Sequence, residues 1–98
     1  MEIKKEKNGT TLSIALSGRL DALSAPDLDK IIQNELNGIV YLVFDMKDLS
    51  YAASAGLRVL LSAQKIMMKQ GSMKLTHVNR EVMDILDMTG FLRFLSIE

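Results

Sequence analysis

Cysteine and tryptophan are absent from this 98-residue sequence, and proline occurs only once. Without cysteine the chain has no disulfide, no thiolate nucleophile and no zinc site with sulfur ligands. Long apolar runs are also missing, because the longest, residues 39–44, is far shorter than the ~20 residues that cross a bilayer. An excess of one charge is absent too, since 12 basic residues balance 12 acidic ones. No net field therefore draws the protein to nucleic acid or anionic lipid.

The remaining composition is that of an ordinary globular protein. Hydrophobic residues make up 48% and charged residues 24% of the chain, which excludes a disordered segment. The length leaves no room for a second core, so we expect one domain spanning residues 1–98. Residues 1–7 are charged and do not form a signal peptide. We expect a soluble, cytoplasmic protein that does not insert into a membrane.

Alternating apolar residues and turn signals predict the strands. Asn8-Gly9 favours a two-residue hairpin, and the alternation in residues 11–17 predicts a half-buried strand that ends at Gly18. Residues 39–44 are apolar on both faces, as in a central parallel strand. Two later segments, residues 74–78 and 91–97, complete the predicted sheet.

Helical spacing of apolar residues predicts three helices. The first begins at Ser24, which together with Asp27 resembles a capping box, and ends at Asn37-Gly38. The second runs from Ser54 to about Lys69. The third follows Asn79 and ends at Gly90. A hairpin followed by alternating helices and strands predicts an α/β fold with a mostly parallel sheet.

Ser54 is the residue at which we expect function to concentrate. Ligands of α/β units lie beyond the carboxyl ends of the strands, where helices begin. At a helix start the Ser54 hydroxyl faces unpaired backbone amides, which accommodate a phosphate. Gly56 leaves the turn open for the approach of another protein. The alternative is that Ser54 only caps the helix.

The helix after Ser54 carries a narrow polar stripe and a wide apolar arc. The stripe consists of Arg58, Ser62, Lys65 and Lys69, at helical spacing. The apolar arc indicates a central helix flanked by two neighbours. The alternative is that Val59, Met67 or Met68 forms an adaptable partner surface.

No set of residues in the sequence indicates catalysis. His77 is the only histidine, and Ser54 lies outside any Gly-x-Ser-x-Gly elbow. Clustering of Asp21, Asp45 and Asp48 at the strand ends is the one pattern that suggests magnesium or phosphoryl chemistry. We therefore predict a protein that is not an enzyme and has neither a cofactor nor a metal site.

Two separated motifs resemble the STAS domain, and more narrowly the bacterial anti-sigma factor antagonists. The first motif is residues 18–22 (GRLDA) followed by residues 24–28 (SAPDL), and the second is residues 48–51 (DLSY) leading to residues 54–61 (SAGLRVLL). The helix ending in Thr89-Gly90 also matches the family. The resemblance covers nearly the whole chain.

This resemblance implies a partner switch. In the family, the serine at the position of Ser54 is phosphorylated by an anti-sigma factor that is itself an ATP-dependent serine kinase. The unphosphorylated domain binds that kinase, and a serine phosphatase restores it after phosphorylation. Asp21 matches a position that contacts the kinase. The candidate partner-binding residues are Asp21, Ser24, Ser54, Ala55, Gly56 and Arg58.

Two positions depart from the family pattern. Ala53 stands where many antagonists have an acidic residue, and Ala55 stands where Ser or Thr is frequent. Ser54 is therefore the only hydroxyl of the motif, while Ser50 and Tyr51 precede the helix. The alternative function is that of a STAS accessory subunit of a membrane transport or signalling complex, which binds without phosphorylation.

Overall fold

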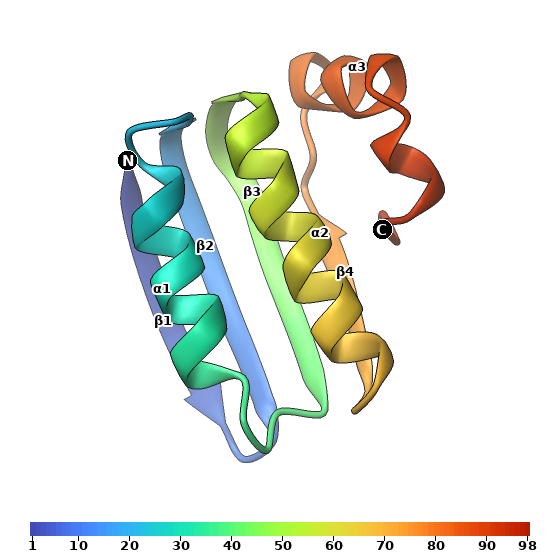
Figure 1. Cartoon of the computed structure of the whole chain (residues 1–98). Helices are drawn as coiled ribbons and strands as arrows, with labels where there is room; N and C mark the ends of the chain where they lie inside the picture. Colours follow the sequence, from blue (N-terminus) through green and yellow to red (C-terminus); the bar gives the residue numbers. More distant parts are fainter.

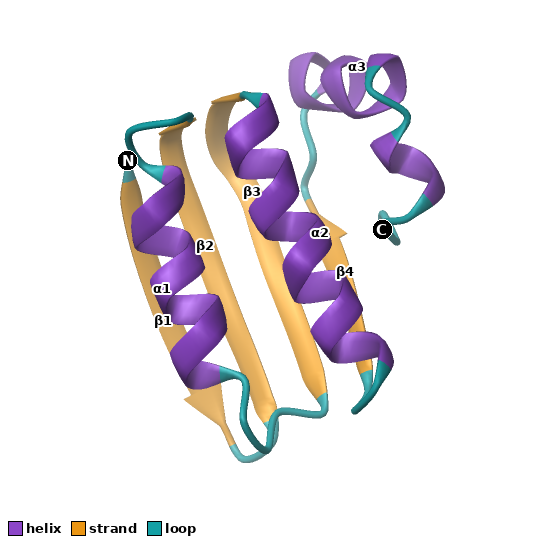
Figure 2. Cartoon of the chain, viewed as in Figure 1, coloured by secondary structure: helices purple, strands orange, loops and turns teal.

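The computed structural model describes residues 1–98 as a four-stranded sheet with helices α1 and α2 on one face (Figure 1). The strand order is β1-β2-β3-β4. Figure 2 shows the two helices running alongside each other over the strands, with α3 at one end of the sheet. The elements are β1 (Glu2–Asn8), β2 (Thr11–Leu20), α1 (Ala25–Glu35), β3 (Tyr41–Ala52), α2 (Ser54–Met68), β4 (Ser72–Thr76), α3 (Arg80–Met88) and the 3-10 helix η1 (Phe91–Arg93).

The sheet confirms the predicted α/β class. β1 pairs antiparallel with β2 through the hairpin at Asn8-Gly9, whereas β2–β3 and β3–β4 are parallel pairs. The crossovers through α1 and α2 bury one face of the sheet in a core that includes Ile14, Phe44 and Leu60. None of the helices combines the length with the apolar composition that a transmembrane span requires.

The central parallel strand predicted at residues 39–44 is confirmed as β3, but its length and the coverage of its second face differ from the prediction. The apolar pattern ends at residue 44, but β3 continues to Ala52, because β2 is long enough to pair with it through two register shifts. Its second face is not covered by a helix, and Tyr41 and Val43 on that face are only half-buried. Helices therefore cover only one face of the sheet.

Helix capping follows the prediction at α3 but not at α1. The Asn79 side chain accepts a hydrogen bond from the Val82 backbone N–H at 2.8 Å. Ser24 occupies the N-cap position of α1, but its side chain forms no cap hydrogen bond, so the predicted capping box is absent. The Ser24 hydroxyl turns back instead and donates to the Arg19 carbonyl at 2.8 Å.

The end of the chain differs from the predicted third helix–strand unit. β4 ends at Thr76, two residues before the predicted end, since His77 takes a left-handed conformation with φ 55°. Residues 91–97 form no strand. Gly90, with φ 79°, turns the chain into η1, and only Ile97 then forms a bridge, with Leu75.

A close approach between α2 and β2 fixes the start of α2. Gly56 is buried, and a Cβ atom there would lie 2.3 Å from Leu20 Cγ and 3.0 Å from the Leu20 carbonyl oxygen. Leu20 is itself fully buried and has no space to move aside.

We expect Gly56→Ala to lower the free energy of unfolding by about 2–3 kcal/mol, because a methyl group there overpacks the contact with Leu20. Gly38→Ala is the control: its φ of 83° is strained for alanine, but nothing lies within 4 Å of the added Cβ. It should cost only about 1 kcal/mol. Urea unfolding measures both; equal losses would show that the contact with Leu20 is unimportant.

Candidate functional site

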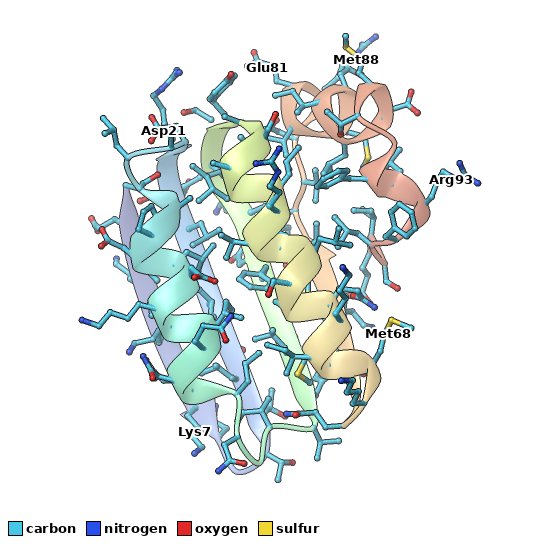
Figure 3. The ribbon with its side chains drawn as sticks, in the orientation of Figure 1. Lys7, Asp21, Met68, Glu81, Met88 and Arg93 are labelled. Atoms are coloured by element: carbon cyan, nitrogen blue, oxygen red, sulfur yellow. The ribbon has the colours of Figure 1, made fainter.

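The ends of β2 and β3 lie side by side and bring two distant loops together. Leu20 pairs with Ala52, and the Ala53 backbone N–H donates to the Leu20 carbonyl at 2.8 Å. The loop that begins at Asp21 therefore adjoins the first turn of α2, where Ser54 lies. Figure 3 shows Asp21 at this end of the molecule and Lys7 at the opposite end. The two motifs found in the sequence thus form one surface.

Ser54 is exposed and its hydroxyl forms no hydrogen bond. It is the first residue of α2, whereas the N-cap is Ala53, which has no side chain that could accept a hydrogen bond. The alternative that Ser54 caps the helix is therefore wrong. The first backbone amides of α2 have no side-chain acceptor, and they form the positive end of the helix dipole.

Asp21 is held in one orientation by its own loop. Its Oδ1 accepts hydrogen bonds from the backbone N–H groups of Leu23 and Ser24, both at 3.1 Å. The Ser24 hydroxyl, whose shorter contact is with the Arg19 carbonyl, lies 3.2 Å from the same oxygen. The Arg19 Nε atom lies 3.9 Å from Oδ2. The pKa of Asp21 is held below its usual value, and the largest cause is the hydrogen bond from the Ser24 N–H. The Leu23 N–H, the Ser24 hydroxyl and Arg19 also lower this pKa, whereas partial desolvation raises it.

Two of the six candidate partner-binding residues lie below the surface. Ser24 is buried and its hydrogen bonds stabilise the Asp21 loop. The space beside Gly56 is filled by Leu20, so the Gly56 backbone is not open to another protein. The expectation that a partner approaches the Gly56 backbone is therefore wrong, because α2 packs directly on the end of β2. Ser54 and Arg58 are exposed, while Asp21 and Ala55 are half-buried.

The same surface contains residues that sequence reasoning missed. Leu23 is 90% exposed, the most exposed large apolar side chain of the protein. Beside it, a shallow hollow of about 250 Å³ lies between the first turns of the two helices, lined by Ala22, Ala25, Pro26, Asp29, Ala55 and Val59. The Arg19 guanidinium stacks 4.3 Å from the centre of the Tyr51 ring. The sequence signal that could have identified this contact is an apolar residue, Leu23, in the otherwise polar loop between Asp21 and Ser24.

The three aspartates do not form a cluster. The Oδ1 atom of Asp45 lies at hydrogen-bond distance, 3.1 Å, from Nδ1 of His77, and Asp48 is exposed on β3. No group of three or more acidic or histidine side chains is arranged to hold a metal ion. The magnesium alternative therefore has no geometric support. His77, expected inside a strand, lies just after β4 with an exposed side chain.

We expect Asp21→Asn to reduce the decrease in the free energy of unfolding that occurs at acidic pH. The pKa of Asp21 is lower in the folded than in the unfolded chain, so its ionised form stabilises the fold at neutral pH. That contribution is lost as the pH falls below about 4. Urea unfolding between about pH 6 and pH 2.5 should show a smaller decline for the variant than for the wild type.

The control is Asp87→Asn, since the Asp87 side chain is exposed on α3 and forms no hydrogen bond. This variant should follow the wild-type curve. Parallel curves for Asp21→Asn and the wild type would contradict the assigned role of the Asp21 hydrogen bonds.

Known proteins similar in sequence support the resemblance seen in the motifs. The family model of the STAS domain matches residues 2–98. The anti-sigma-B factor antagonist of Bacillus subtilis (strain 168) is 32% identical over 99 residues, covering 99% of this chain and 88% of that protein. The anti-sigma F factor antagonist of Paenibacillus polymyxa is 30% identical over 102 residues, covering 99% of this chain and 86% of that protein.

Solved structures share the fold. The anti-sigma factor antagonist SpoIIAA in its unphosphorylated form superposes with a TM-score of 0.83 at 18% identity, covering 99% of this chain and 88% of that one. The murine anion transporter Slc26a9 contains a similar fold, with a TM-score of 0.73 at 15% identity, covering 94% of this chain and 17% of that one. The family match over residues 2–98 decides the assignment: the chain belongs to the STAS domain family.

Proposed function

We propose that this protein is an anti-sigma factor antagonist that works by partner switching. In its unphosphorylated form it binds an anti-sigma factor that is an ATP-dependent serine kinase. Phosphorylation of Ser54 releases it, and a serine phosphatase restores it. The protein acts in the cytoplasm as a substrate and binding module, without catalytic activity of its own.

The exposed, unbonded hydroxyl of Ser54 is the observation that carries this proposal. A serine that capped its helix would lose a hydrogen bond when modified. Ser54 has none to lose, and the kinase can reach it from solvent. Curated relatives about 30% identical over nearly the whole chain are named as antagonists of anti-sigma factors, which supports the same role here.

The first turn of α2 is suited to hold a phosphate. Phosphorylation adds about −1.5 to −2 charges at neutral pH, beside the unpaired amides of the helix start. Arg58 lies one helical turn after Ser54, is exposed and forms no ion pair, so it is available to the phosphate. Modification therefore requires no rearrangement of the fold.

Charge then acts against the partner rather than on the fold. A partner that fits closely around Asp21 also meets the new phosphate. If a partner carboxylate or another fixed negative charge lies ~5 Å away, each unit of phosphate charge costs ~3 kcal/mol at an effective dielectric near 20. This corresponds to a roughly 100-fold loss of affinity before screening by salt.

The two alanines beside Ser54 limit the modification to one residue. Ala53 and Ala55 carry no hydroxyl, and Ser50 on β3 donates its hydroxyl to the Gly18 carbonyl at 2.8 Å. Without an acidic residue at position 53, the cognate kinase must recognise Ser54 through other contacts. Leu23 and the hollow beside it supply an apolar contact close to the serine.

The fold alone does not separate this role from the alternative of an accessory subunit of a transport or signalling complex. The similarity to a transporter lies at 15% identity and covers 17% of that chain. The named antagonists match at 30–32% identity along 99% of this chain, and they favour the switch.

Phosphate mapping tests the modification. The purified protein is incubated with ATP and a lysate of its own host, and then digested and analysed by mass spectrometry. We expect phosphate on Ser54 and none in Ser54→Ala. Ser50→Ala and Ser62→Ala are matched controls and should be modified like the wild type, since Ser62 lies on the same helix two turns further on.

Phosphate on any other residue, or an unmodified Ser54 in a lysate that phosphorylates other substrates, would contradict the proposed switch. It would instead favour the accessory-subunit role, in which binding does not depend on phosphorylation.

Binding measurements separate charge from the loss of the hydroxyl. Ser54→Ala should fold and retain the wild-type affinity for the kinase, because no hydrogen bond is removed. Ser54→Asp places a single negative charge at the helix start and should weaken binding at least tenfold. Calorimetry with the purified kinase measures both. Equal affinities of the two variants would exclude a switch based on charge.

A further inference from the structure

A groove with an apolar floor lies between the second half of α2 and the segment that follows α3. Its volume is about 320 Å³. We call it the C-terminal groove; the residues that line it are Leu61, Gln64, Lys65, Met68, Arg93 and Phe94.

The C-terminal groove exposes apolar surface beside unpaired positive charge. Met68 is 72% and Phe94 56% exposed. Lys65 and Arg93 are exposed, form no ion pair, and face no carboxylate among the lining residues. This part of the surface is therefore unpartnered in the isolated chain.

The outward side of α3 carries the opposite charge. Glu81, Asp84 and Asp87 are exposed and form no ion pair, and Met88 beside them is 87% exposed. We call this the acidic face of α3. Figure 3 shows Glu81 and Met88 at one end of the molecule, whereas Met68 and Arg93 lie on its flank. The two surfaces of one molecule therefore point in different directions.

We propose that these surfaces bind each other between molecules, so that α3 of one copy docks in the C-terminal groove of a second copy. Met88 contacts the apolar floor at Met68 and Phe94, and the carboxylates of α3 lie against Lys65 and Arg93. Three of the seven strongly exposed large apolar side chains belong to these two surfaces, and each is covered by the contact.

The chemistry of the contact sets its strength. A formal net charge of zero means that two copies do not repel each other at long range. Each exposed ion pair contributes little, and α3 has only 9 residues, so the association is weak and falls as salt screens the charges. The contact does not include Ser54, and it is independent of the proposed switch.

Sedimentation equilibrium of the full chain tests the proposal. At about 50 mM salt the average mass should rise with protein concentration up to about 1 mM, and at about 0.5 M salt it should stay close to that of the monomer. A constant monomer mass at low salt over this range would overturn the proposal.

Two pairs of charge reversals locate the contact. Lys65→Glu with Arg93→Glu reverses the groove, and Asp84→Lys with Asp87→Lys reverses the face of α3. Each double variant alone should be monomeric, with an amide NMR spectrum as dispersed as that of the wild type. Lys7→Glu with Lys30→Glu is the matched control: it changes the charge equally at exposed positions outside the groove and should associate like the wild type.

Mixing the variants gives the decisive result. The groove-reversed protein keeps an intact α3, and the α3-reversed protein keeps an intact groove. Their two reversed surfaces also carry opposite charges, so an equimolar mixture should associate although neither protein does so alone. A mixture that stays monomeric, or double variants that still associate alone, would show that these two surfaces do not bind each other.

Discussion

The parallel pairing of β2 with β3 is the interaction on which the rest of the structure depends. It extends to Leu20 and Ala52, well beyond the central apolar part of either strand, and so brings the Asp21 loop beside the start of α2. The absence of a side chain at Gly56 then lets α2 pack directly on Leu20. Hydrogen bonds of the sheet and one close packing contact thus fix the orientation of Ser54 relative to Asp21, although neither side chain contributes to the core.

In this arrangement the residues that stabilise the fold are different from the residues of the candidate site. The core residues lie between the sheet and its helices, whereas Ser54 is exposed and unbonded and Asp21 is held only by its own loop. A phosphate on Ser54 changes the charge of the surface by more than one unit but displaces no buried group. The same fold therefore persists in both states of the proposed switch, and a partner distinguishes them by electrostatics.

α2 connects two parts of the surface with different chemistry. Its first turn carries the candidate phosphorylation site, and its second half borders the C-terminal groove. The polar stripe predicted from spacing is solvent-exposed at Arg58, Lys65 and Lys69, while Val59 and Met67 are core residues. Only Met68 of the three apolar candidates is exposed. One helix thus packs against the core, starts at Ser54 and borders a second surface.

The sequence by itself determined the α/β class, the hairpin, the bounds of α2 and the two motifs that converge at Ser54, because periodicity, glycines and local capping act over a few residues. Tertiary structure alone decided the length of β3, the irregular C-terminal segment, and the burial of Ser24 and Gly56. Two of these features depend on partners distant in sequence, because β2 extends β3 and Leu20 fills the space beside Gly56. The Ser24 hydroxyl instead donates to the Arg19 carbonyl five residues earlier, an alternative to helix capping that the local pattern does not reveal. A local pattern identifies a helix start, but only the packed neighbours decide which of its side chains remain exposed to another protein.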